Sequence, residues 1–231
     1  AHPEMDVSFP MWPELLAEKL DMDYINLGHS GAGNEYIFSS ILHQIVEINS
    51  DDIGLVIPAW TQAQRKDIKI RGIWKHLDQV RNYPYYKHRT NHGDIQHRIQ
   101  ESIILYYSLQ EICKSKKIPL NQFQMLPMFL GFDWDPIAKK HKDGRENAYK
   151  ILVRTIYNNP YYHEINNNFL GWPISKKLGG FSLNLKAFKG YEKDDEEYMK
   201  CIISDTDSHP NALGNKILAK HVKEEYEKIN S

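Results

Sequence analysis

One stretch decides the fold: Asp23-Tyr24-Ile25-Asn26-Leu27-Gly28-His29-Ser30-Gly31-Ala32-Gly33-Asn34. Residues 23–27 have the composition of a short strand, and the glycine-rich run after them is typical of a tight turn. Asn34 is placed to cap a helix, because its side chain can accept a backbone N–H there. Apolar residues then recur at helical spacing, namely Tyr36, Ile37, Ile41, Ile45 and Ile48. The stretch therefore predicts strand, turn and helix, which is half of a βαβ unit.

A second apolar run, Ile-Gly-Leu-Val-Ile at residues 53–57, has strand length. Strands buried on both faces of a parallel sheet have this composition. Residues 119–127 are predicted to form another core strand. Helices are expected at residues 12–20, 73–80, 95–116, 146–157 and 211–228. The last of them is expected to bury Leu213, Ile217, Leu218 and Val222. A weak strand is expected at residues 198–203. This alternation predicts an α/β fold, a three-layer α/β/α sandwich with a mostly parallel, flavodoxin-like sheet.

We expect one domain over residues 1–231, with a loop-rich insertion or lid at about 128–195. Gly, Pro and Asn clusters in that range are typical of loops. Its aromatic residues allow two interpretations, a cleft lining or local packing, and local packing is the commoner use of aromatics in loops. They are Trp134, Tyr161, Tyr162, Phe169 and Trp172.

Composition narrows the class of protein. The 231 residues are 41% hydrophobic and 26% charged, as in ordinary globular proteins. The net charge of -1, with both signs interspersed, gives no electrostatic case for a nucleic-acid or membrane partner. No apolar run approaches the length that spans a bilayer. Cys113 and Cys201 provide no disulfide framework, so we expect free thiols and a cytoplasmic location.

The stretch Asp207-Ser208-His209-Pro210 carries the clearest chemical signal. A histidine whose ring is oriented by a nearby carboxylate is what nucleophilic catalysis needs as its general base. Pro210 suits the first turn of the helix that comes next. The alternative interpretation is structural, with His209 as a helix-entry residue and Asp207 as a cap.

Thr61 is a second candidate, because Ala59-Trp60-Thr61-Gln62 comes directly after the predicted strand at 53–57. Ligand contacts in open α/β sheets lie at the C-terminal ends of the strands. The alternative is that Thr61 only caps the next segment of the chain. His88, His92 and His97 have no familiar metal-ligand spacing, and neighbouring Lys and Arg residues would oppose a cation, so we expect neither a metal nor a cofactor.

Two of these stretches resemble conserved blocks of the SGNH/GDSL-type hydrolases. Residues 26–34 look like the second block, and residues 207–214, with the pattern D-x-H-P-N-x-x-G, are similar to the last block. The resemblance implies that His209 activates a serine and that Asp207 orients its ring, with Asp205 as the fallback. It implies that Gly31 gives a backbone N–H to the oxyanion hole, with Asn34 and Thr61 as further oxyanion or substrate-binding candidates.

The chain departs from the family pattern at two places. The third block usually supplies a glycine and an asparagine, where this chain has residues 59–62, so Thr61 or Gln62 would substitute. The Gly-Asp-Ser nucleophile block is not found in residues 1–11. We expect the serine to lie upstream of Ala1. The alternatives are a catalytically silent relative, and Ser30 as nucleophile in residues 28–32, which mimic the G-x-S-x-G elbow of the α/β-hydrolases.

The resemblance therefore implies a serine ester hydrolase or acyl transferase that works through an acyl-enzyme, on a small-molecule or glycan ester. The competing expectation is a silent SGNH-like module that binds a glycan or an acylated ligand.

Overall fold

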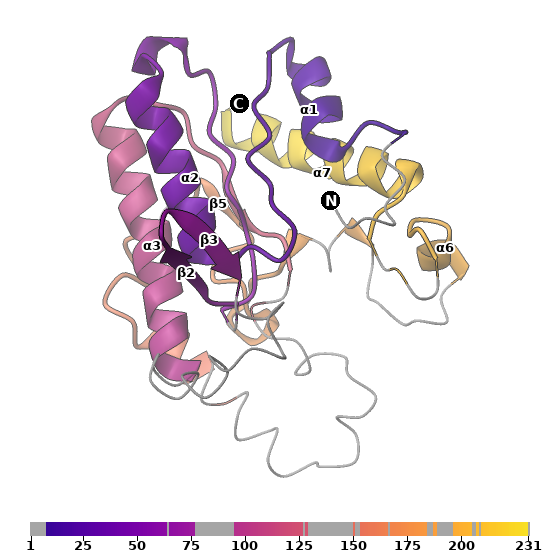
Figure 1. Ribbon diagram of the computed structural model, residues 1–231. Helices are drawn as coiled ribbons and strands as arrows, with labels where there is room; N and C mark the ends of the chain where they lie inside the picture. Colours follow the sequence, from indigo (N-terminus) through magenta and orange to yellow (C-terminus); the bar gives the residue numbers. More distant parts are fainter. Residues whose placement is uncertain are drawn as a thin grey trace. The chain divides into compact units, whose positions relative to one another are not determined.

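The computed structural model describes residues 8–63, 65–76, 95–126, 128, 150, 153–165, 167–183, 187–188, 196–204, 207 and 209–230 (Figure 1). The chain forms two compact units. One comprises residues 31–182, and the other combines residues 1–30 with residues 183–231. The fold is mixed α/β with a small parallel sheet, as the alternation of elements predicts at its coarser level.

The sheet belongs to the unit of residues 31–182. Its strands are β1 (Ala59–Trp60), β4 (Gln122–Gln124) and β5 (Phe169–Leu170), parallel and in the order β1-β4-β5. A parallel bridge between Val56 and Leu120 extends the first pair in the same register. Pro58 lies between the bridge and β1, and it has no N–H to give to the ladder. The core strand predicted at 119–127 is thus confirmed, whereas the predicted strand at 53–57 contributes only the bridge at Val56, and β1 follows at residues 59–60.

Polar side chains occupy the middle of this sheet and are paired. Trp60, Phe123, Gln122 and Gln124 are all 0% exposed. The Trp60 indole donates to Gln122 Oε1 at 2.9 Å, and Gln124 Nε2 donates to the carbonyl of Thr61 at 2.6 Å. Because buried amides are costly unless bonded, these contacts fix the backbone at the C-terminal end of β1.

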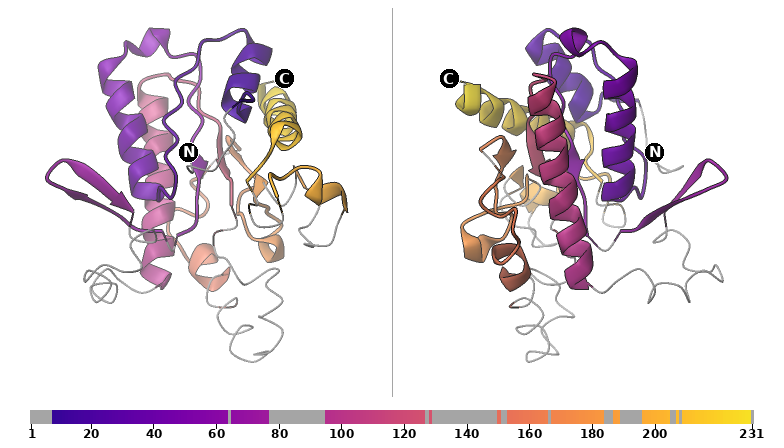
Figure 2. Two further views of the ribbon diagram at one scale, coloured as in Figure 1. Left: turned by 45° about the vertical axis from the view of Figure 1, so that its right-hand side comes forward. Right: turned by 90° about the vertical axis from the view of Figure 1, so that its left-hand side faces the viewer.

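Helices α2 (Asn34–Glu47) and α3 (Ile95–Ser115) lie side by side in this unit (Figures 1 and 2). The buried face of α3 has the predicted spacing and is fully buried at Ile99, Ile103, Tyr106, Leu109 and Cys113. Both predicted helices are confirmed. Short 3-10 turns occur at η1 (Ser50–Asp52) and η5 (Lys176–Leu178), and residues 153–157 are helical within the predicted range 146–157.

A β-hairpin replaces the helix predicted at 73–80. It pairs β2 (Asp67–Ile70) with β3 (Ile73–His76), and its turn projects away from α2 and α3 in Figure 2. Arg71 and Gly72, between the strands, have φ of 50° and 80°. Positive φ at both central residues is the turn geometry that matches strand twist, and glycine adopts it without strain. The helix prediction is therefore wrong over residues 73–76, and residues 77–80 lie outside the described part.

In the unit of residues 1–30 and 183–231, the regular elements of the described part are helices. Helix α1 (Trp12–Leu20) packs against α7 (Ala212–Asn230), and the short α6 (Glu196–Met199) precedes α7. Both long helices were predicted. Leu218 and Val222 are buried, but Leu213 is 47% exposed, contrary to the predicted face.

Two predicted strands are wrong in this unit. Residues 22–29 form no helix or strand, and Tyr24 and Ile25 are 48% and 62% exposed. Strand composition is insufficient without a ladder partner and a buried face. The strand predicted at 198–203 is divided between α6 and a single antiparallel bridge from Ile202 to Pro210.

Strand β5 lies within the range expected to be an insertion or lid. Beside it, Trp172 packs on Phe169 and on Tyr162, with ring centroids 5.3 and 5.9 Å apart. The Trp172 indole also donates to the carbonyl of Tyr162 at 3.0 Å. These aromatic residues pack on one another, while Trp134 lies outside the described residues.

Candidate functional site

The loop that carries Asp207 and His209 is closed by backbone hydrogen bonds. The N–H of Ile203 donates to the carbonyl of His209 at 3.0 Å, and the N–H of Ser204 donates to that of Asp207 at 3.1 Å. The N–H of Asp207 in turn donates to Ser204 Oγ at 3.0 Å. The ends of the loop are therefore held together, and the two candidate residues have a fixed spacing.

Asp207 and His209 form a carboxylate–imidazole pair. His209 Nδ1 lies 2.5 Å from Asp207 Oδ1, which also accepts the backbone N–H of His209 at 3.0 Å. Because a carboxylate accepts, the proton lies on Nδ1, and Nε2 is the acceptor of the neutral ring. The His209 side chain is 54% exposed, and Nε2 has no hydrogen-bond partner in the described part of the chain. The pair has the form of an oriented general base.

Helix α7 has its own cap, so Asp207 does not serve as one. Asn211 Oδ1 accepts the N–H groups of Leu213 and Gly214 at 3.0 and 3.1 Å. Its Nδ2 donates to the carbonyls of Lys200 and Ile202 at 2.9 and 2.8 Å. The helix begins at Ala212, so the placement of Pro210 in its first turn is wrong. Pro210 instead pairs with Ile202, because the Asn211 cap starts the helix two residues later.

Two residues in the first turn of α7, Gly214 and Asn215, fix the loop against the helices. Asn215, 2% exposed, donates to the carbonyl of Pro210 at 3.0 Å and accepts the N–H of Trp12 from α1 at 2.9 Å. At Gly214 a Cβ atom would lie 2.2 Å from the carbonyl oxygen of Cys201. A side chain at position 214 would push the loop away from the helix, so the close packing of the loop requires glycine there.

Residues 31–33, the end of the glycine turn before α2, belong to the other unit and have a buried anchor. Gly31 has φ of 76°, in the left-handed region that glycine adopts readily. The N-cap residue of the helix is Gly33, not Asn34 as predicted. Glycine has no side chain with which to accept the first N–H groups of the helix. The Asp67 carboxylate accepts the N–H of Gly33 at 3.0 and 2.9 Å and that of Tyr36 at 2.9 Å. The cap therefore comes from a residue far along the chain, for which the sequence gives no local signal.

Asn34 is instead bonded to Thr61. Its Oδ1 accepts the N–H of Thr61 at 2.9 Å, and its Nδ2 donates to the carbonyl of Thr61 at 3.3 Å and to Ser102 Oγ at 3.0 Å. Tyr106, 3.4 Å from Nδ2, completes the group, and burial raises the pKa of its phenol, so that it stays protonated. The Oγ1 of Thr61 is buried without a hydrogen-bond partner among the described residues. Two predicted site residues, Asn34 and Thr61, thus lie in direct contact.

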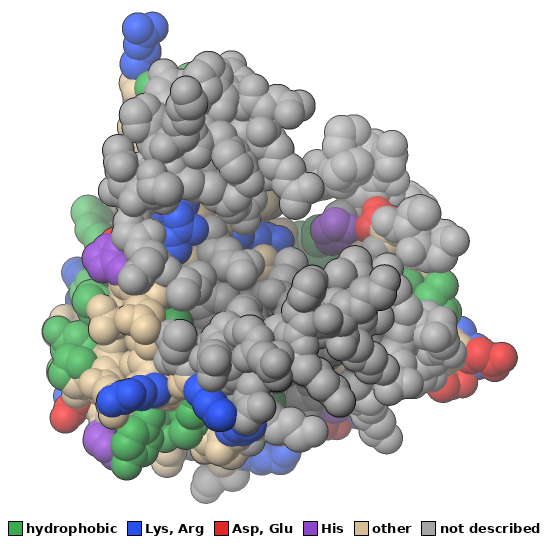
Figure 3. All heavy atoms as spheres, turned by 90° about the horizontal axis from the view of Figure 1, so that it is seen from below, with side chains coloured by type: hydrophobic (Ala, Val, Ile, Leu, Met, Phe, Trp, Pro, Cys, Tyr) green, Lys and Arg blue, Asp and Glu red, His purple; other side chains and the backbone are tan. Residues whose placement is uncertain are grey.

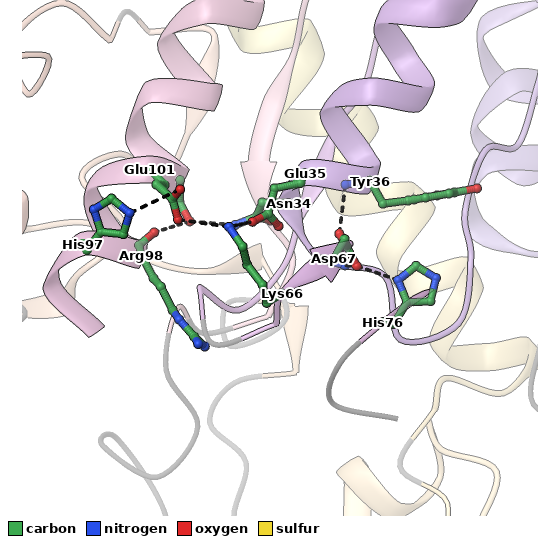
Figure 4. A network of polar contacts seen from close by, with 11 residues as sticks. Asn34, Glu35, Tyr36, Lys66, Asp67, His76, His97, Arg98 and Glu101 are labelled. Atoms are coloured by element: carbon green, nitrogen blue, oxygen red, sulfur yellow. Dashed lines mark hydrogen bonds and ion pairs between the residues drawn. The ribbon is translucent and has the colours of Figure 1, made fainter. Parts of the chain in front are cut away.

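A charged network flanks this region on α2 and α3 (Figure 4). Lys66 Nζ lies 2.5 Å from Glu35 and 3.3 Å from Glu101, which also lies 3.4 Å from His97 Nε2. Burial acts to lower the pKa of Lys66, but its contacts with Glu35 and Glu101 outweigh burial and raise it. His97 thus lies beside a carboxylate of its own helix at the surface.

The remaining candidates are less defined. Ser30 is half-buried in the turn, and its carbonyl lies 3.1 Å from His29 Nδ1. The strand that a nucleophile elbow needs before it is not formed at residues 22–29. Asp205, His88 and His92 lie outside the described residues. Within the described ranges, no three His, Cys, Asp or Glu side chains are grouped to hold a metal ion.

The described surface agrees with the near-neutral sequence. Figure 3 shows Lys and Arg side chains interspersed with hydrophobic, polar and acidic ones on one face. Among the described helices, none has both the length and the apolar character that crossing a bilayer requires.

Comparison with known proteins gives no relative. No protein-family model matches the chain, and neither a curated protein nor a solved structure matches it significantly.

Proposed function

We propose that this protein is an SGNH-type serine ester hydrolase or acyl transferase in which His209 is the general base. The observation that carries the proposal is the 2.5 Å contact between His209 Nδ1 and Asp207 Oδ1. It occurs in a loop whose neighbouring helix is capped by Asn211, so Asp207 is available to orient the ring. The proposal includes the finer fold, a three-layer α/β/α sandwich with a flavodoxin-like sheet. The parallel order β1-β4-β5 and the helices α2 and α3 support it.

In this mechanism His209 Nε2 takes the proton of the serine hydroxyl as Oγ attacks the ester carbonyl carbon. The tetrahedral intermediate collapses, the C–O bond to the alcohol breaks, and Nε2 returns the proton to the departing oxygen. Water or an acceptor alcohol then attacks the acyl carbon as Nε2 takes its proton, the C–O bond to the serine breaks, and Nε2 returns the proton to serine Oγ. Asp207 stays ionised and stabilises the imidazolium in both halves of the reaction.

The oxyanion is assigned to the Gly31 N–H, with Thr61 as a further donor. A donor placed where charge develops is worth roughly 3 kcal/mol. In the proposal Asn34 acts through Thr61, since its amide bonds both backbone groups of that residue. The Thr61 hydroxyl, buried and without a described partner, is the side-chain donor available in place of the family's asparagine.

The nucleophile is found by covalent labelling. A fluorophosphonate probe reacts with an activated serine, and peptide mass spectrometry of the full-length protein locates the adduct. The proposal predicts labelling that His209→Ala abolishes. Ser30→Ala separates the two serine candidates: loss of labelling identifies Ser30, and retained labelling points to another serine. Absence of labelling in the unaltered protein contradicts the proposal.

The second candidate function is a silent module that binds a glycan or an acylated ligand. It is favoured by the residues at 59–62, which lack the family's glycine and asparagine. Saturable binding of an acetylated oligosaccharide without probe labelling would support it, and turnover of that ligand would contradict it.

A further inference from the structure

The carboxylate of Asp67 joins the hairpin, the glycine turn and the start of α2. Its side chain is 0% exposed, and it lies at the first residue of β2. Both oxygens accept the N–H of Gly33, Oδ2 also accepts the N–H of Tyr36 at 2.9 Å, and Oδ1 lies 2.5 Å from His76 Nδ1 (Figure 4). A buried carboxylate is tolerated when its oxygens are bonded in this way.

These contacts reproduce a helix cap from outside the helix. Gly33 is the cap residue and Tyr36 is the third residue of α2, so their N–H groups are the ones a capping box satisfies. Gly33 has no side chain to do this. Asp67 supplies the acceptor, and its negative charge lies at the favourable end of the helix dipole.

The approach of Asp67 is close enough to require glycine at position 33. A Cβ atom there would lie 2.7 Å from Asp67 Oδ2 and 2.8 Å from the carbonyl oxygen of Arg65. Gly31, two residues earlier, has φ of 76°. The carboxylate thus fixes the backbone two residues after Gly31.

His76 fixes the carboxylate in turn. Asp67 and His76 are directly paired across the hairpin, and the His76 side chain is 4% exposed. The Tyr36 ring packs edge-on against His76 at 5.5 Å and against Trp74 at 5.7 Å. The hairpin is thus attached to the start of α2 by a hydrogen-bonded and an aromatic contact.

We infer that Asp67 is a positioning residue, which together with His76 holds the turn of residues 31–33 in the shape that presents the Gly31 N–H to the oxyanion. This inference rests on the proposed function, and Asp67 itself touches no reacting atom. It assigns a catalytic purpose to a hairpin that no part of the SGNH-like pattern accounts for.

The test compares Asp67→Asn and His76→Gln with Asp52→Asn, an exposed aspartate changed in the same way. An amide at position 67 cannot accept all the bonds that the carboxylate accepts, so the turn loses part of its support. We expect kcat for a chromogenic ester to fall about 10- to 100-fold in Asp67→Asn and by a smaller factor in His76→Gln, with KM changed less than about threefold. Asp52→Asn should match the unaltered protein.

Amide hydrogen exchange provides a second readout, independent of activity. The amides of Gly33 and Tyr36 should exchange at least about tenfold faster in Asp67→Asn than in Asp52→Asn. If Asp67→Asn does not fold, His76→Gln carries the same two measurements.

The outcomes separate the two claims. Unchanged kcat in folded Asp67→Asn, while His209→Ala is inactive, overturns the positioning role alone. An unaltered protein without ester hydrolysis or probe labelling overturns the proposed function, and with it the catalytic purpose of Asp67. Hydrogen exchange then still decides whether Asp67 holds the turn: equal exchange in the two aspartate variants would show that it does not.

Discussion

The Asn34 side chain bonds both backbone groups of Thr61, accepting its N–H at 2.9 Å and donating to its carbonyl at 3.3 Å. This reciprocal contact ties the first turn of α2 to the C-terminal end of β1. Ser102 and Tyr106 on α3 share the same amide nitrogen. Three elements of the unit therefore meet at one buried asparagine.

Asn34→Ala should lower the free energy of unfolding by about 2–4 kcal/mol, because it leaves buried donors and acceptors without partners. Asn26→Ala is the matched control, since within the described residues the Asn26 side chain only accepts the exposed N–H of Gly28. It should cost less than about 1 kcal/mol. Urea unfolding measures both. Equal effects would contradict the placement of Asn34 at the centre of the network.

Gly214→Ala should destabilise the protein, contrary to the usual effect of this change. Alanine in a helix normally gains about 1 kcal/mol over glycine. Here the new Cβ would lie 2.2 Å from the carbonyl oxygen of Cys201, which must move away from α7. We expect a net loss of about 1–3 kcal/mol in the free energy of unfolding. A rise in the thermal midpoint would show that the loop does not pack as described.

Asn211→Asp should cost less stability than Asn211→Ala. The aspartate keeps the oxygen that caps Leu213 and Gly214 but loses the bonds from Nδ2 to Lys200 and Ile202. Loss of the cap and these bonds together is expected to cost about 2–3 kcal/mol in the alanine variant. Thermal unfolding monitored by circular dichroism gives the order. An alanine variant as stable as the aspartate variant would argue against this cap.

Stability should fall as the pH rises from about 9 to about 11. Burial raises the pKa of the Cys113 thiol from 9.0 to about 11. The unfolded chain therefore loses this proton first, so the contribution is complete below pH 9 and is lost as pH passes through the folded value. Urea unfolding across this range should show a decline that is weaker in Cys113→Ala. The same slope in both proteins would assign the decline to other groups.

The periodicity of the helices was sufficient to predict α1, α2, α3 and α7. It failed at residues 73–76, where apolar spacing compatible with a helix was overruled by the turn at Arg71 and Gly72. It also failed at 23–27, because pairing and burial decide whether a strand forms. Helix capping was predicted from the nearest asparagine, whereas the acceptor came from Asp67.

The candidate site shows the same difference between local and distant contacts. The pairing of Asp207 with His209 could be predicted from their spacing, because two residues in one short loop can meet without contacts from distant parts of the chain. Asp67 and His76 depend on the register of a hairpin and on its approach to α2, neither of which leaves a pattern in the sequence. Asn34 and Thr61 were each predicted from the sequence as site residues, but their contact with each other was not predicted.

The most direct test of the central claim is the rate of ester hydrolysis by His209→Ala beside that of His43→Ala. Both histidines are exposed and lie next to a carboxylate, Asp207 for the one and Glu47 for the other. If His209 is the general base, its removal should lower kcat for a short-chain chromogenic ester by roughly 10²- to 10⁴-fold, and His43→Ala should leave it unchanged. Equal rates in the two variants would contradict the assignment of His209 as the base.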